Sequence, residues 1–204
     1  YHMPKNADEK RGKILEVAKK RFAHYGLAKT TMAEIAKDLA FSKALLYYYF
    51  PDKSSLFKAV VEDIAEELKE EITKLIHPQI TAEEGLYIVL ENRIAYLKKY
   101  FYIIEYTLLN RKDTPNDINE LLMKSFKDQK DLVKMVLDYA VQSGELTPID
   151  TDEIANIFLN ACMGMRSVVM KDFKNYFVPH KDEFDSVLLL QKKIAHIFVR
   201  GLKN

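Results

Sequence analysis

The chain has 204 residues, of which 48% are hydrophobic and 30% charged, and its formal net charge is +1. This composition is sufficient for a buried core under a polar surface, and the single cysteine, Cys162, excludes a disulfide within the chain. The most apolar stretch, residues 154–170, is interrupted by Asn160 and Arg166 and does not predict a membrane span. We therefore expect a soluble protein of the reducing cytoplasm.

The small net charge hides an asymmetry along the chain. Residues 3–60 contain 12 basic and 6 acidic side chains, whereas the remainder contains 19 basic and 24 acidic ones. A basic N-terminal quarter favours binding to a polyanion. The alternative is an ordinary solvated helix face with an excess of lysine.

Apolar residues recur with the helical period throughout the chain, and no alternating strand pattern is present. The first expected helix covers about residues 8–25 and ends at Gly26, which suits a helix C-terminus. The residues that share its apolar stripe are Ile14, Leu15, Ala18 and Phe22.

Two short helices follow. Thr31 and Glu34 form a T-x-x-E capping box, which predicts a helix that buries Ile35, Ala36 and Leu39. After a turn at residues 40–42, Ser42 is placed to cap a helix over residues 43–49, which Pro51 ends. So short a helix pair buries little by itself, and it makes sense mainly when the second helix is presented outward.

The rest of the chain predicts a larger helical body. Asp52 begins a long helix over about residues 53–76, and a second capping box, Thr81 with Glu84, begins the next. The later helices are expected at about residues 81–100, 102–110, 117–143, 151–171 and 181–201. The prediction is an all-α protein of about nine helices, with an N-terminal three-helix bundle at residues 3–50 and a helical body at residues 51–204.

The segment from Thr31 to Leu56 resembles the tetracycline-repressor (TetR) family of bacterial transcription regulators. The positions that match its pattern in register are Thr31, Ile35, Ala36, Ser42, Leu46, Tyr47, Tyr49, Phe50, Lys53 and Leu56. The sequence departs from the pattern at the turn, where Ala40 and Phe41 replace glycine and valine, and at Ala44, which replaces a glycine. The resemblance implies a helix-turn-helix domain that binds a DNA half-site.

The resemblance also implies which residues contact DNA. The positions equivalent to the family's DNA-contacting residues, or next to them on the second short helix, are Thr31, Ser42, Lys43, Ala44, Leu45, Tyr47, Tyr48 and Lys53. Hydroxyls, ammonium groups and a helix N-terminus suit phosphate oxygens, and Lys43 can also reach a guanine edge. Structural alternatives stay open, because Thr31 and Ser42 are capping residues, Lys53 can be a solvated lysine, and successive tyrosines can form a buried cluster.

One helix-turn-helix is a small interface, so specific binding favours a dimer that reads two half-sites. The segments 151–171 and 181–201 are apolar on more than one face, which requires cover on both sides. The residues expected at a homodimer interface are Ala161, Gly164, Val168, Ile194, Ile197 and Phe198. The alternative is a thick core within one chain.

An effector pocket is expected in the body, because tyrosines provide apolar walls with polar tips. Its candidate residues are Arg93, Tyr96, Tyr100, Tyr106, Asn160 and Arg166. Arg166 has a structural alternative, which is an ion pair with Glu91 or Glu105. Aromatic stripes are also common in ordinary cores.

No enzyme signature is present. The five histidines lack the Glu-x-x-His spacing of a metal-carboxylate bundle, and no Gly-rich phosphate loop or G-x-S-x-G elbow occurs. Cys162 lies in an apolar helix, which favours an inert thiol. We therefore expect no metal, no cofactor and no catalysis.

Taken together, these features predict a homodimeric, ligand-responsive transcription regulator, most simply a repressor released from operator DNA by a small-molecule effector. A helical protein-interaction adaptor is the alternative. It would explain the helices, but neither the capped short pair nor the charge asymmetry.

Overall fold

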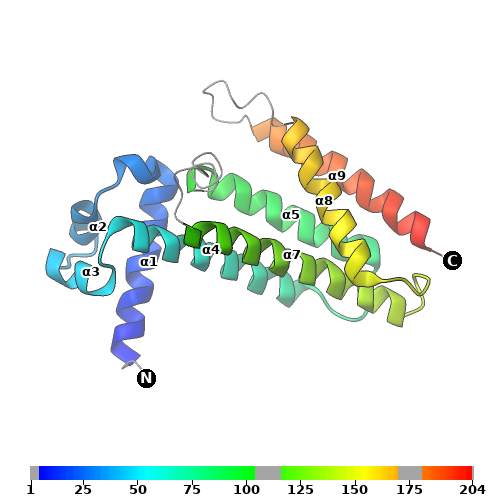
Figure 1. Cartoon of the computed structure of the whole chain (residues 1–204), viewed down its shortest axis with the longest axis horizontal. Helices are drawn as coiled ribbons and strands as arrows, with labels where there is room; N and C mark the ends of the chain where they lie inside the picture. The colour runs from blue at the N-terminus through cyan, green and yellow to red at the C-terminus, as the bar shows by residue number, and fades with distance from the viewer. Residues whose placement is uncertain (1–4, 104–115, 170–180, 204) are drawn as a thin grey trace. The chain divides into compact units, whose positions relative to one another are not determined.

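The computed structural model describes the backbone of residues 5–103, 116–169 and 181–203, and the side chains of residues 8–103, 120–165 and 183–203. Its named elements are all helices, and the described residues contain no strand beyond one isolated bridge between Leu146 and Lys203. The helices are α1 (Lys5–Lys29), α2 (Met32–Asp38), α3 (Lys43–Tyr49), α4 (Lys53–Leu75), α5 (Ala82–Lys99), α7 (Asn116–Gln142), α8 (Thr151–Val169) and α9 (Lys181–Leu202) (Figure 1).

These bounds confirm the predicted helices in the described parts of the chain. Residues 101–103 are helical as well, but most of the helix expected at residues 102–110 lies outside the described residues. The same holds for the polar break at residues 111–115. No helix in the described parts has the length and apolar character needed to cross a membrane.

The chain divides into two compact units. An N-terminal unit consists of residues 1–67 and 99–122, and a C-terminal unit consists of residues 68–98 and 123–204. The long helix α4 contributes to both, because the division falls after Glu67. The expected boundary near residue 50, between a DNA-binding domain and a helical body, stays a prediction.

The core of the N-terminal unit forms around α1. Its predicted stripe is fully or almost fully buried: Ile14, Leu15, Ala18 and Phe22. Phe22 packs edge-on against Phe57 of α4, with ring centroids 5.5 Å apart. Gly26 interrupts the helix with φ of 75°, a conformation that glycine adopts without steric cost. The short helix α2 then packs against α1, and α3 packs against α2 (Figure 1).

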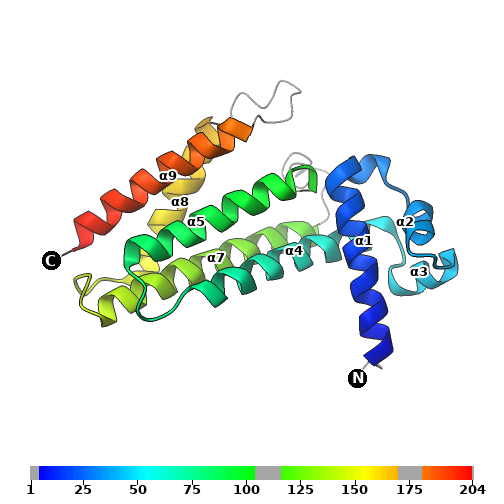
Figure 2. The same ribbon diagram turned by 180° about the vertical axis from the view of Figure 1, so that it is seen from behind.

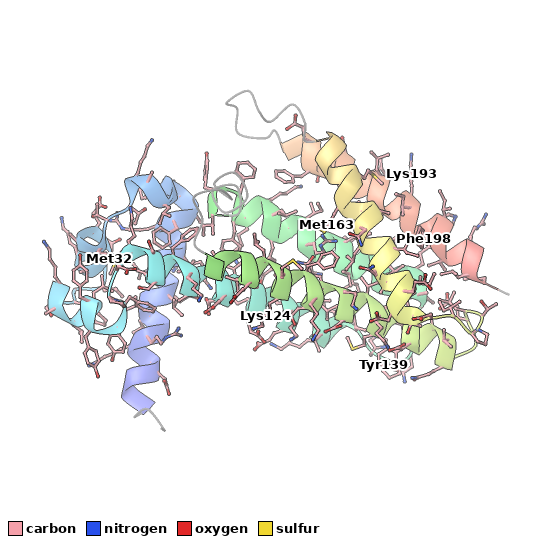
Figure 3. The ribbon with its side chains drawn as sticks, in the orientation of Figure 1. Met32, Lys124, Tyr139, Met163, Lys193 and Phe198 are labelled. Carbon is pink, nitrogen blue, oxygen red and sulfur yellow. The ribbon has the colours of Figure 1, made fainter. Side chains whose placement is uncertain are left out.

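The C-terminal unit has one continuous apolar core, to which α4, α5, α7, α8 and α9 contribute. Helices α5 and α7 approach closely at Gly85, where an added Cβ would lie 2.6 Å from Val136 Cγ1. Helices α8 and α9 lie side by side, as the two opposite views show (Figures 1 and 2). Phe158 of α8 meets Phe198 of α9 with ring centroids 5.6 Å apart, and Figure 3 locates Phe198 on α9.

Candidate DNA-binding surface

The helix α2 begins with a complete capping box. The Glu34 amide donates to Thr31 Oγ1 at 3.3 Å, and the Thr31 amide donates to Glu34 Oε2 at 2.9 Å. The Thr31 hydroxyl also donates to this carboxylate at 2.7 Å, and these hydrogen bonds lower the pKa of Glu34. The capping role predicted for Thr31 is therefore confirmed.

An arginine on α1 fixes the other end of α2. Arg21 donates from Nε and Nη2 to the two carboxylate oxygens of Asp38, at 2.5 and 3.0 Å. This forked contact lowers the pKa of Asp38 and is geometrically more specific than a single ion pair. It holds α2 against α1 from a position that the sequence pattern did not single out.

The turn between the two short helices contains a strained residue. Ala40 has φ of 52°, and among the described residues it is the one non-glycine with positive φ. Because alanine replaces the family's glycine at this turn, its side chain makes the left-handed conformation a strained one. Ser42 then caps α3 by accepting a hydrogen bond from the Leu45 amide at 3.1 Å.

Helix α3 is anchored on one face and open on the other. Leu46 and the following Phe50 are buried, whereas Tyr47 is 48% exposed and Tyr48 is 81% exposed. Lys43 and Ala44 are also exposed, and Leu45 is half-buried. The successive tyrosines therefore do not form a buried cluster, and α3 presents a cationic and aromatic face to the outside of its unit.

Lys53 has a structural partner that the sequence did not reveal. Its ammonium donates to the carbonyl oxygens of Leu27 and Thr30, at 2.9 and 3.1 Å. These carbonyls lie at the end of α1, where backbone acceptors lack helical partners. The half-buried Lys53 thus ties the start of α4 to the α1–α2 junction, and its DNA contact stays a prediction.

The candidate pocket residues differ in their burial. Arg93 and Tyr96 are buried in the C-terminal unit, whereas Tyr100 is buried in the N-terminal unit, where its hydroxyl donates to Glu67 Oε2 at 3.4 Å. Asn160 is exposed and donates to the Asn156 carbonyl at 2.9 Å. Tyr106 and the side chain of Arg166 lie outside the described residues.

Two further expectations concern α8 and α9. Burial raises the pKa of Cys162 to about 11, so the thiol stays protonated at neutral pH, as expected for an inert cysteine. Glu91, one suggested partner of Arg166, forms an ion pair with Lys192.

The candidate dimer residues differ in their exposure. Ile197 is 66% exposed, Gly164 is exposed, and Ala161 and Ile194 are half-buried. Phe198 is half-buried and packs within its own unit, and the side chain of Val168 lies outside the described residues.

Helices α2 and α3 are both capped, a tight turn joins them, and α3 faces outward. This arrangement defines a helix-turn-helix DNA-binding unit. The comparisons with known proteins agree with this class. Residues 14–60 match the family described as bacterial regulatory proteins of the tetR family. The HTH-type transcriptional regulator QacR of Staphylococcus aureus is 26% identical over 195 residues, which cover 94% of this chain and 97% of QacR.

Two solved structures share the fold over nearly the whole chain. A transcriptional regulator from Cytophaga hutchinsonii is 28% identical, with a TM-score of 0.85 over 97% of this chain and 100% of its own. A TetR-family regulator from Mesorhizobium loti is 20% identical, with a TM-score of 0.78 over 99% of this chain and 100% of its own.

The chain therefore belongs to the TetR family of bacterial transcriptional regulators. Members of this family bind operator DNA and small-molecule effectors, and they form homodimers. It is a family of regulators and not of enzymes.

Proposed function

We propose that this protein is a cytoplasmic homodimeric repressor that a small-molecule effector releases from its operator. The observation that carries the proposal is the exposure of Tyr47, Tyr48 and Lys43 on a helix whose opposite side is anchored by buried Leu46. Such a helix offers donors and aromatic edges to a major groove without disturbing its own core.

The proposed division of labour follows the predicted domains. Residues 3–50 would bind a half-site through Thr31, Ser42, Lys43, Ala44, Leu45, Tyr47 and Tyr48, with Lys53 adding a phosphate contact if its ammonium leaves the α1 carbonyls. The body at residues 51–204 would hold the effector. Arg93 and Tyr96, which are buried in the C-terminal unit, are candidate residues to contact it.

Effector binding would release DNA because the effector binds the DNA-incompetent conformation more tightly. A preference of about 100-fold corresponds to about 2.7 kcal/mol, which lies within the range of known allosteric couplings. The dimer would present two recognition helices about 34 Å apart, or a multiple of this distance.

The direct test is operator binding by surface variants. An operator is first selected from random-sequence duplexes with the wild-type protein, and dissociation constants are then measured by fluorescence anisotropy at several salt concentrations. Lys43→Ala and Tyr47→Ala are each expected to weaken binding by about tenfold, because each removes a base or phosphate contact. Lys43→Ala should also reduce the slope of log affinity against log salt by about one.

Tyr102→Ala provides a matched control, because Tyr102 is an exposed tyrosine outside α2 and α3. Its affinity should equal that of the wild type, and all three variants should melt near the wild-type temperature. Unchanged operator affinity in both α3 variants would show that this helix does not contact DNA. The alternative of a helical protein-interaction adaptor would then be favoured.

A further inference from the structure

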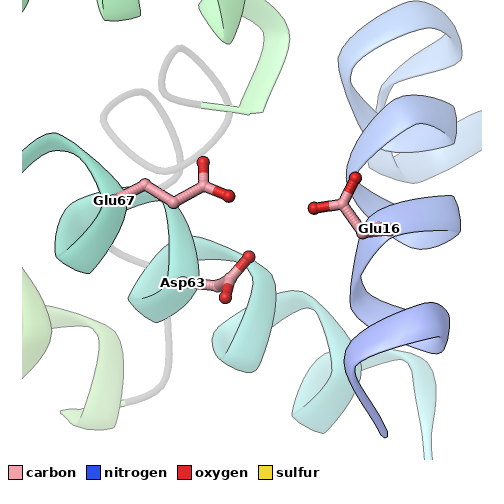
Figure 4. Close-up of side chains that lie close together, drawn as sticks. All are labelled: Glu16, Asp63 and Glu67. Atoms are coloured by element: carbon pink, nitrogen blue, oxygen red, sulfur yellow. The ribbon is translucent and has the colours of Figure 1, made fainter. Parts of the chain in front are cut away.

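A buried lysine on α1 lies among three carboxylates. Lys19 is only 4% exposed, and its ammonium binds Asp63 Oδ2 at 2.5 Å, Glu67, and Glu16 Oε1 at 3.4 Å. Figure 4 shows Glu16 on α1 and the side chains of Asp63 and Glu67 on α4 turned toward the same space. These carboxylates form the one group in the described residues that could hold a metal ion, and the lysine ammonium already lies among them.

The charge of Lys19 is held by its partners. Burial by itself lowers the pKa of an ammonium, but hydrogen bonds to Asp63 and Glu67 outweigh it, and the pKa of Lys19 is raised. A buried cation that keeps its charge must stay within reach of its carboxylates, since an unpaired charge in this position is strongly unfavourable. The contact therefore resists any motion that separates α1 from this part of α4.

The contact lies far along α4. Asp63 and Glu67 are one helical turn apart and share a face, and Glu67 is 14 residues beyond Lys53, which corresponds to about 21 Å of helix. Lys53 joins the start of α4 to the end of α1, and Phe22 packs on Phe57 between the two polar contacts. Helix α4 is thus attached to α1 at three levels, from its first residue to Glu67.

Glu67 is also the point at which a third segment joins. Tyr100, which follows the end of α5, donates from its hydroxyl to Glu67 Oε2 at 3.4 Å. Lys19, Glu67 and Tyr100 lie at the wall of one cleft of about 410 Å³ in the N-terminal unit. The Glu67 carboxylate therefore contacts both Lys19 of α1 and Tyr100, which directly follows α5.

We propose that Lys19 is a positioning residue that locks the DNA-binding helices to α4 as far as Glu67, so that α1–α3 and residues 53–67 move as one body. This inference rests on the proposed function, because its consequence is that the separation of the two recognition helices in the dimer cannot change through a hinge at the start of α4. Any bend of α4 that repositions α3 then falls after Glu67, and not at the start of the helix.

The test compares operators that differ only in the distance between half-sites. One inserted or deleted base pair displaces a half-site by roughly 3.4 Å and rotates it by roughly 35°. With the lock intact, wild-type protein should bind the altered spacings at least about tenfold more weakly than the selected operator. Lys19→Met should reduce this ratio to below about threefold, while a base change within a half-site still weakens binding as in the wild type.

Two further variants keep the test decisive. Lys19→Arg retains the cation and should keep a spacing ratio close to that of the wild type. If Lys19→Met fails to fold, the combined variant Lys19→Met, Asp63→Asn, Glu67→Gln removes all three charges together and leaves no buried ion unpaired. A folded variant without the Lys19 charge that keeps the wild-type spacing ratio would overturn the proposal.

A second readout does not depend on DNA. In wild-type protein, amide hydrogen exchange over residues 14–22 of α1 and 56–67 of α4 should quicken together, at the same denaturant concentrations, as denaturant is added. In the combined variant, residues 56–67 should exchange independently of residues 14–22. If wild-type protein selects no operator, the proposed function fails, and unchanged joint exchange in the variant would separately refute the lock.

Discussion

The seven residues of α3 include some that pack in the core and some that face outward. Leu46 is buried, and Phe50 is buried directly after the helix, whereas Tyr47 and Tyr48 point away from the core of their unit. The aromatic residues in this run therefore differ in role, because Phe50 packs in the core whereas Tyr47 and Tyr48 face outward. The helix is too short to bury them all, and the burial of Leu46 decides which side faces outward.

The turn before α3 carries a cost that one substitution should remove. Ala40 has φ of 52°, a conformation that costs an L-residue about 1–2 kcal/mol but glycine almost nothing. Ala40→Gly should raise the free energy of unfolding by about 0.5–1 kcal/mol, because relief of strain exceeds the added flexibility of the unfolded chain. Urea denaturation followed by circular dichroism measures this change.

Ala95→Gly is the matched control for this prediction, since Ala95 is exposed within the regular helix α5. The free energy of unfolding of that variant should fall by about 1 kcal/mol, because glycine is unfavourable inside a helix. Equal destabilisation by both substitutions would show that the turn at residue 40 is not strained in solution.

The helices show a common logic at the scale of the element. Capping residues begin α2, α3 and α5, and the Ser55 amide donates to Asp52 Oδ1 at 2.7 Å at the start of α4. This bond and its neighbours lower the pKa of Asp52. Local sequence therefore sets where each of these helices begins, because the capping groups lie within three residues of the amides that they satisfy.

The packing of α5 on α7 depends on a missing side chain. A Cβ at Gly85 would lie 2.6 and 2.9 Å from the two Cγ atoms of Val136, and a β-branched side chain has little freedom to move aside. Gly85→Ala should therefore lower the free energy of unfolding by about 1–3 kcal/mol through overpacking. Chemical denaturation of the purified protein checks this value.

Gly12→Ala tests the same chemical change where no neighbour interferes, because a Cβ added at this position of α1 would meet nothing within 4 Å. The free energy of unfolding of this variant should rise by about 0.5–1 kcal/mol, because the unfolded chain becomes less flexible. If Gly85→Ala is also stabilising, α5 and α7 do not approach as closely as described.

At the scale of the whole molecule, α8 and α9 expose apolar residues that one chain leaves uncovered. The exposed members are Ile157 on α8 and Leu189, Leu190 and Ile197 on α9. A Cβ on Gly164 would meet nothing within 4 Å among the described residues, so none of these residues requires a glycine here. Both observations suit a surface that a second copy covers, as the family's homodimers require.

A charge in this surface should break the dimer. Ile197→Glu places a carboxylate on the most exposed apolar residue of α9, where burial against a partner would leave the charge unpaired. Sedimentation velocity should show a monomer at concentrations at which the wild type is a dimer.

Met123→Glu introduces the same charge on α7, at a residue that is 70% exposed, and should leave the dimer intact. A dimeric Ile197→Glu protein would exclude this face of α9 from the interface. It would then leave the exposed residues of α8 and α9 without an explanation.

Much of the architecture was predictable because its determinants are local. Apolar spacing identified the described helices, and the capping boxes placed the starts of α2 and α5. Gly26 interrupts α1 and Gly144 follows the end of α7, both with positive φ. The exposure of α3 also followed from its length and composition. The DNA contacts, the pocket and the dimer residues remain predictions, because they concern molecules that bind to this chain.

The amino-acid sequence by itself determined the helices, their caps and the family, since these depend on residues a few positions apart. The tertiary structure alone decided which distant groups meet. It placed Lys19 between Asp63 and Glu67, and it gave Lys53 the carbonyls of Leu27 and Thr30 as partners. The physical reason is that a lysine in a helical pattern looks solvated in the sequence, and only the packing of one helix on another shows whether its charge is buried and paired.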